Sequence, residues 1–136
     1  MSAASRAKLL LVEDSSANRE LLRSILKPME LELIEATNGE EGVEAAQAQD
    51  FDMILMDVMM PVMDGVKATK ALRALGGRFS RIPIVGLTAN NAPEQIASYR
   101  QAGMDEVLTK PIDPVRLVRS VFYWASRSAE ADVVMI

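Results

Sequence analysis

The sequence contains no cysteine and no histidine. Without cysteine, the chain has no disulfides and no thiolate metal sites. Without histidine, it lacks the commonest general base, the usual zinc ligand and any internal phosphohistidine. No apolar run approaches the roughly 18 residues of a membrane-spanning helix, and residues 1–6 lack the apolar stretch of a signal peptide. We therefore expect a cytoplasmic protein, or the cytoplasmic piece of a larger one, with no membrane contact by this domain.

The length and charge of the chain narrow its class further. Its 136 residues suit one compact domain, and 49% apolar residues allow a sizeable core. Aspartate and glutamate (19) outnumber lysine and arginine (15). This acidic balance argues against nucleic acid as a partner, and no segment is typical of DNA binding.

Short apolar runs alternate with longer segments of helical spacing. We predict strands at residues 8–12, 32–36, 53–56, 82–87 and 106–109, and helices at 17–27, 40–49, 66–75, 93–102 and 114–127. Asp113 is expected to cap the last helix. Five strand–helix repeats with continuously apolar strands predict an α/β fold with a parallel sheet covered on both faces.

Functional side chains follow four of the five predicted strands. Glu13 and Asp14 follow the first, Asp57 ends the third, Thr88 ends the fourth and Lys110 follows the fifth. Each has an ordinary explanation when taken alone: Asp14 could cap a helix, with Ser15 and Ser16 as rival caps, and Lys110 could be a solvated surface lysine. Ligands of open parallel sheets bind at the carboxyl ends of the strands, so the joint placement predicts one site there.

Grouping three carboxylates is unfavourable unless a cation neutralises them. Mg²⁺ prefers oxygen ligands and keeps several waters, whereas Zn²⁺ would want the missing histidine or cysteine, and no calcium-binding loop of the EF-hand type is present. An aspartate beside Mg²⁺ can act as a nucleophile toward phosphorus, while a lysine and a hydroxyl bind the other phosphoryl oxygens.

Four segments of this sequence resemble the receiver domain of response regulators, the CheY-like family. They are residues 10–14 (LLVED), 56–65 (MDVMMPVMDG), 87–90 (LTAN) and 108–111 (LTKP). The second and third segments look like those of receivers in hybrid sensor histidine kinases. The resemblance spans residues 8–127, leaving an N-terminal tail at 1–7 and a C-terminal tail or linker at 128–136. It implies a flavodoxin-like (βα)5 three-layer sandwich with a central five-stranded parallel sheet of order 2-1-3-4-5.

The resemblance also implies roles for the acidic residues. Asp57 would be the phosphoacceptor, taking a phosphoryl group from a phosphohistidine. Glu13 and Asp14 would hold Mg²⁺ together with Asp57 and the backbone carbonyl of Met59. The domain would catalyse its own phosphorylation and slow dephosphorylation, and it would belong to a conventional enzyme only as part of a hybrid histidine kinase.

The remaining site positions carry one departure from the family pattern. By resemblance, Thr88 would bind the phosphoryl group and signal its presence, Lys110 would pair with a phosphoryl oxygen, and Pro111 would follow a cis peptide. Many family members have Tyr or Phe three residues before the lysine, where this chain has Val107. The aromatic switch is therefore absent, and a phosphorylation signal must use other contacts.

The implied function is a step in two-component or phosphorelay signalling, with a histidine kinase or a histidine phosphotransfer domain as partner. One alternative is a pseudo-receiver that only binds proteins, but such a domain would have lost an acid or the lysine. A hydrolase of the haloacid dehalogenase type would need an acid at Met59. A flavodoxin-type carrier would need a longer Ser/Thr-rich loop than Ser15 and Ser16 provide. The sequence leaves open whether the chain is a stand-alone regulator or a domain of a hybrid kinase.

Overall fold

The computed structural model describes residues 6–60 and 62–134, with side chains described as far as Arg127. Five strands alternate with five helices, as the sequence predicts. The strands are β1 (Lys8–Val12), β2 (Glu32–Ala36), β3 (Met53–Asp57), β4 (Ile84–Thr88) and β5 (Glu106–Thr109). The helices are α1 (Ser16–Leu26), α2 (Gly39–Ala48), α3 (Gly65–Ala74), α4 (Pro93–Ala102) and α5 (Pro114–Val134), with short 3-10 turns η2 (Lys27–Met29) and η3 (Gly77–Ser80).

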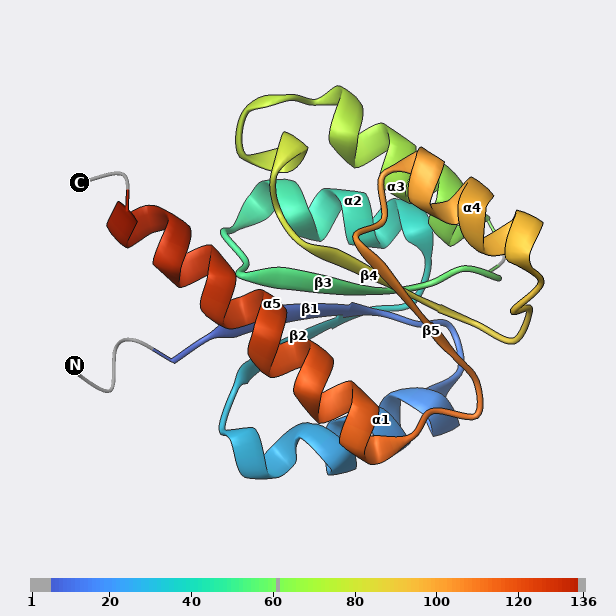
Figure 1. The fold of residues 1–136 in the computed structure, drawn as a ribbon, viewed down its shortest axis with the longest axis horizontal. Coiled ribbons are helices and arrows are strands. Elements are labelled where there is room, and N and C mark those ends of the chain that lie inside the picture. The colour runs from blue at the N-terminus through green and yellow to red at the C-terminus, as the bar shows by residue number, and fades with distance from the viewer. Residues whose placement is uncertain (1–5, 61, 135–136) are drawn as a thin grey trace.

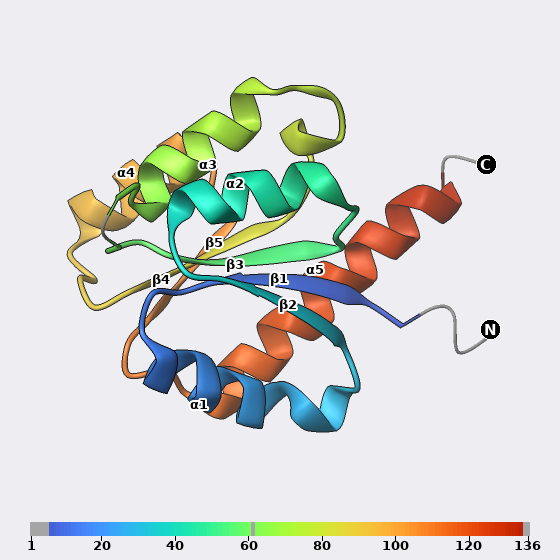
Figure 2. The same ribbon diagram turned by 180° about the vertical axis from the view of Figure 1, so that it is seen from behind.

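The strands form one parallel sheet in the order β2-β1-β3-β4-β5, which confirms the predicted topology. Helices α1 and α5 cover one face, and α2, α3 and α4 cover the other (Figures 1 and 2). Alternate residues of β1 enter different cores: Leu9 and Leu11 pack toward α1 and α5, whereas Leu10 and Val12 pack toward α2 and α3. Burial on both faces explains why the central strands are continuously apolar.

Polar caps start most helices at the carboxyl edge of the sheet. The side chains of Ser15, Asn38 and Asp64 accept hydrogen bonds from backbone N–H groups in the first turns of α1, α2 and α3. Asp113 caps α5 as predicted, because its side chain accepts from the N–H of Val115 at 2.9 Å. The caps fix where these loops turn, and three of the four capped loops, those after β1, β3 and β5, carry residues of the predicted site.

Two element ends differ from the prediction by more than one residue. Strand β4 begins at Ile84 rather than Ile82, because the N–H of Ile82 still donates to the carbonyl of Arg78 in the turn after η3. Helix α5 ends at Val134 rather than near Arg127, since the added residues include the good helix formers alanine and glutamate. The end of α5 projects past the sheet on the side where β1 begins (Figure 1).

The expected tail regions are described only in part. Residues 1–5 of the N-terminal tail and residues 135–136 of the C-terminal tail lie outside the described residues. Within residues 6–60 and 62–134, no helix combines the length and the apolar character needed to cross a membrane.

Candidate metal site

The structure brings Glu13, Asp14 and Asp57 together at the carboxyl edge of the sheet. One carboxylate oxygen from each residue lies within 4.8 Å of the other two. The contact follows from topology, because β1 pairs with β3 and Val12 lies opposite Met56. Glu13 and Asp57 are buried, at 0% and 2% exposure, while Asp14 is exposed. The cluster is therefore buried at Glu13 and Asp57 and open to solvent at Asp14.

Lys110 is the cation of this site. Its Nζ lies 3.1 Å from Oδ1 of Asp57 and 3.5 Å from Oε1 of Glu13, and it donates to both. The backbone N–H of Lys110 donates to the carbonyl of Thr88, so the end of β4 holds the end of β5 in place. The Lys110–Pro111 peptide is cis, as the resemblance implies.

The electrostatics of the cluster show an excess of negative charge. Burial, followed by the neighbouring Glu13 carboxylate, raises the pKa of Asp57 to about 7, although Lys110 acts in the opposite direction. Burial by itself lowers the pKa of the Lys110 ammonium, but Asp57 and then Glu13 outweigh it, and its pKa lies above the usual value. One ammonium group does not balance the buried carboxylates, so the site favours a further cation.

The loop after β1 leaves Asp14 available as a ligand. Ser15, one of the rival caps, takes the N-cap position of α1, and its hydroxyl accepts from the N–H of Asn18 at 3.2 Å. The N–H of Ser15 donates to Oε2 of Glu13 at 3.1 Å. Asp14 is thus free of the capping role that its sequence position also allowed.

The loop after β3 brings the start of α3 close against Asp57. A β-carbon on Gly65 would lie 2.1 Å from the carbonyl oxygen of Asp57, so only glycine fits there. The N–H of Met59 donates to Oδ1 of Asp57 over a long 3.4 Å. The proposed ligand role of the Met59 carbonyl stays a prediction.

Thr88 lies at the end of β4, the strand next to that of Asp57, and Val107 lies on β5, one strand further on. Thr88 is buried, and its hydroxyl accepts from the N–H of Asn90 at 3.0 Å. Val107 is opposite Gly86 and packs against the core cluster that includes Tyr99 and Met104. The aromatic ring in this part of the core therefore comes from α4, not from β5.

Arg19 is a residue of this region that the sequence did not indicate. Its Nη1 donates to the carbonyl of Glu13 at 2.8 Å and to that of Asp14 at 3.2 Å. In the sequence, Arg19 is one of several charged residues of an amphipathic helix, and nothing there connects it with the acidic pair.

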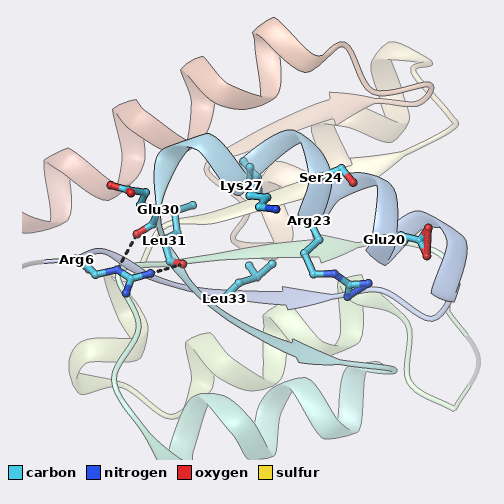
Figure 3. Close-up of a pocket in the computed structure, with 9 residues that line it drawn as sticks. Arg6, Glu20, Arg23, Ser24, Lys27, Glu30, Leu31 and Leu33 are labelled. Carbon is cyan, nitrogen blue, oxygen red and sulfur yellow. Dashed lines mark hydrogen bonds between the residues drawn. The ribbon is translucent and has the colours of Figure 1, made fainter.

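A large groove lies elsewhere in the described structure. It has a volume of about 770 Å³ and runs between α1 and the edge strand β2 (Figure 3). Leu26, Leu31 and Leu33 contribute its apolar part, and Arg6, Arg23 and Lys27 contribute cations. None of the predicted site residues lines it.

Three comparisons with known proteins agree on one family. The model of the response regulator receiver domain matches residues 9–122. The sensor protein GacS of Pseudomonas syringae pv. syringae is 42% identical over 119 residues, which are 86% of this chain and 13% of that protein. The chain thus spans a small part of the length of this curated relative.

Two solved structures share the fold. The receiver domain of a sensor histidine kinase from Pseudomonas aeruginosa, with a magnesium ion coordinated in its active site cleft, is 34% identical with a TM-score of 0.82; the match covers 90% of this chain and 99% of that one. The receiver domain of the Saccharomyces cerevisiae response regulator Ssk1, in complex with the histidine phosphotransfer protein Ypd1, has a TM-score of 0.83 at 27% identity, covering 89% and 90% of the two chains.

Proposed function

Because the chain belongs to the response regulator receiver domains, which serve two-component and phosphorelay signalling, we propose that Asp57 is its phosphoacceptor. The observation that carries this proposal is the position of Asp57: it is buried at the end of β3, beside two further carboxylates and in contact with Lys110. The protein-binding pseudo-receiver is not favoured, because the acids and the lysine are all present and adjacent.

Mg²⁺ fits the acidic cluster. Glu13, Asp14 and Asp57 offer hard oxygen ligands within a few ångströms of one another, and the exposed side at Asp14 leaves room for the waters that Mg²⁺ retains. The raised pKa of Asp57 indicates that the metal-free site holds too little positive charge to balance its carboxylates. When bound, the ion would screen the phosphoryl oxygens and keep Asp57 ionised.

The side chains then have distinct tasks in the transfer. An oxygen of the Asp57 carboxylate attacks the phosphorus of the donor phosphohistidine, the new O–P bond forms, and the P–N bond breaks as the electron pair returns to the imidazole. Lys110, which contacts Asp57 Oδ1, is placed to bind an oxygen of the arriving phosphoryl group. Thr88, at the end of the next strand, would offer its hydroxyl to another oxygen.

A histidine phosphotransfer domain or a histidine kinase is the partner that this chemistry requires. Exposed apolar side chains lie in the loop that follows Asp57: Met59 and Val62 are 73% and 78% exposed. On α1, Leu21 is also half exposed. Apolar groups near a charged site suit transient contact with a protein that carries the phosphohistidine. We place this domain, residues 8–127, in the cytoplasm, where the phosphohistidine is formed from ATP.

A small phosphodonor tests the assignment directly. Incubation with acetyl phosphate and Mg²⁺ should add one phosphoryl group to the protein, seen by intact mass spectrometry. The Asp57→Asn variant should gain none, whereas Asp113→Asn, which alters an exposed cap of α5 outside the site, should behave like the wild type. Stoichiometric phosphorylation of Asp57→Asn would disprove the assignment.

A further inference from the structure

Arg19 of α1 joins three separate parts of the chain. Its Nη1 donates to the carbonyl oxygens of Glu13 and Asp14, at 2.8 and 3.2 Å. Its Nε lies 3.2 Å from Oε1 of Glu35 on β2, and the side chain is only 17% exposed. The other oxygen of that carboxylate, Oε2, is held by Nη1 of Arg23 at 2.7 Å. One guanidinium group thus connects the loop after β1 to the edge of the sheet.

The two carbonyls that Arg19 binds belong to the residues that carry the acidic side chains. Asp14 is exposed, and its carboxylate forms no hydrogen bond within the described residues. The direction of its side chain therefore depends on its backbone. A guanidinium can hold two carbonyls and a carboxylate at once, because its N–H donors are fixed in one plane; a lysine ammonium cannot reproduce that fork.

We propose that Arg19 is a positioning residue for Mg²⁺: by fixing the backbone of Glu13 and Asp14, it presets the direction of their carboxylates toward Asp57. The inference rests on the proposed function. Arg19 contacts Glu13 and Asp14 through their backbone carbonyls and not through their carboxylates. Its positive charge taken alone would oppose cation binding. Arg19 therefore contributes by keeping the loop after β1 ordered, and Glu35 holds the Arg19 guanidinium in place.

Arg23 supplies a matched control. It binds the same Glu35 carboxylate from the same helix, one turn further on, but forms no hydrogen bond with the loop after β1. Figure 3 shows it on the wall of the groove between α1 and β2. An Arg→Lys change at either position keeps the charge and the helix propensity, and only the change at Arg19 removes the bonds to the two carbonyls.

The test is calorimetric titration of the full chain with MgCl₂. Arg19→Lys should weaken Mg²⁺ binding about tenfold, the lower end of the range for residues that orient metal ligands, and Arg23→Lys should stay close to the wild type. Amide exchange of residues 13–18 in the metal-free protein should become faster in Arg19→Lys only. Thermal melts show whether both variants are folded.

A neutral variant separates the effect of Arg19 on the order of the loop after β1 from the effect of its positive charge. If loop order dominates, Arg19→Gln also binds Mg²⁺ more weakly than the wild type; tighter binding would show that charge dominates and would overturn the proposal. Equal weakening in Arg19→Lys and Arg23→Lys would also overturn it, because the effect would then belong to the α1–β2 contact in general. Absence of binding by the wild type would instead refute the proposed Mg²⁺ site itself.

Discussion

Lys110 and Asp57, 53 positions apart in the sequence, meet at 3.1 Å between Nζ and Oδ1. Their strands, β5 and β3, flank β4 in the same parallel direction, so both residues lie at the same edge of the sheet. The Asp57 side chain is buried, whereas the Lys110 side chain is 26% exposed. Under the proposed function, the two groups that would face one phosphoryl unit are thus in contact before that unit arrives.

The raised pKa of Asp57 makes the stability of the metal-free protein depend on pH. The pKa is about 7 in the folded state and 3.8 for an unperturbed aspartate, so between these values the folded state holds the extra proton. The free energy of unfolding should therefore fall as pH rises from about 4 to about 7, by on the order of a few kcal/mol. Urea unfolding in chelator at several pH values measures it.

The matching control is Asp57→Asn, which has no group to titrate at this position. Its unfolding free energy should lack the decrease over the same pH range. If wild type and variant shared the same pH dependence, the source of the slope would lie outside Asp57.

Mg²⁺ should stabilise the folded protein at neutral pH, because it binds the assembled carboxylates and not the unfolded chain. At 100 times its dissociation constant, the ion adds roughly 2.7 kcal/mol to the free energy of unfolding. Thermal melts with and without millimolar MgCl₂ report the shift. Asp14→Asn should reduce it while changing metal-free stability by less than about 0.5 kcal/mol, since the Asp14 carboxylate is exposed. A melting curve that Mg²⁺ leaves unmoved would speak against the site.

Arg73 is expected to be the most sensitive arginine for stability. Its guanidinium donates to the carbonyls of Phe79, Ile82 and Gly103 and to Oδ2 of Asp105, and so ties α3 to the loops before β4 and β5. Arg73→Lys should lower the free energy of unfolding by about 2–4 kcal/mol, because most of these partners would be left unpaired.

Urea denaturation checks this against Arg119→Lys, a change at an exposed position on α5 that should be close to neutral. If the Arg73→Lys and Arg119→Lys variants were equally stable, the carbonyl groups that Arg73 binds would have to be hydrogen-bonded to water in the variant.

Phosphorylation should change the structure chiefly at the start of α4. Val107 is short and stiff at χ1 and already packs against the cluster with Tyr99 and Met104, so it cannot swing as an aromatic ring would. A phosphoryl group that draws in Thr88 would therefore act on the loop from Thr88 to Pro93, where the Thr88 hydroxyl holds the N–H of Asn90.

Amide exchange with and without beryllofluoride, a phosphoryl mimic, measures that change. We expect altered protection in residues 88–102. No change there, with Asp57 saturated, would favour a domain that serves as a phosphoryl relay rather than a switch.

The helices, the strands and the residues at their ends could be predicted from the sequence. Short apolar runs and segments of helical spacing placed all five strands and five helices, because each element must bury one or both of its faces. The sequence also placed Glu13, Asp14, Asp57, Thr88 and Lys110 at strand ends, where a parallel sheet collects ligands. The predicted element ends were wrong at Ile82, which belongs to the turn after η3 and not to β4, and at the end of α5, which extends to Val134.

Tertiary structure decided what depends on contacts between distant segments. The competition among Asp14, Ser15 and Ser16 for the cap of α1 is settled by geometry: Ser15 caps, and Asp14 is released toward the other acids. The pKa of Asp57 depends on burial and on Glu13, neither of which its neighbours in the sequence specify. The bonds from Arg19 to the carbonyls of the acidic pair likewise arise only when α1 packs against β1 and β2, because backbone acceptors carry no signal in the sequence.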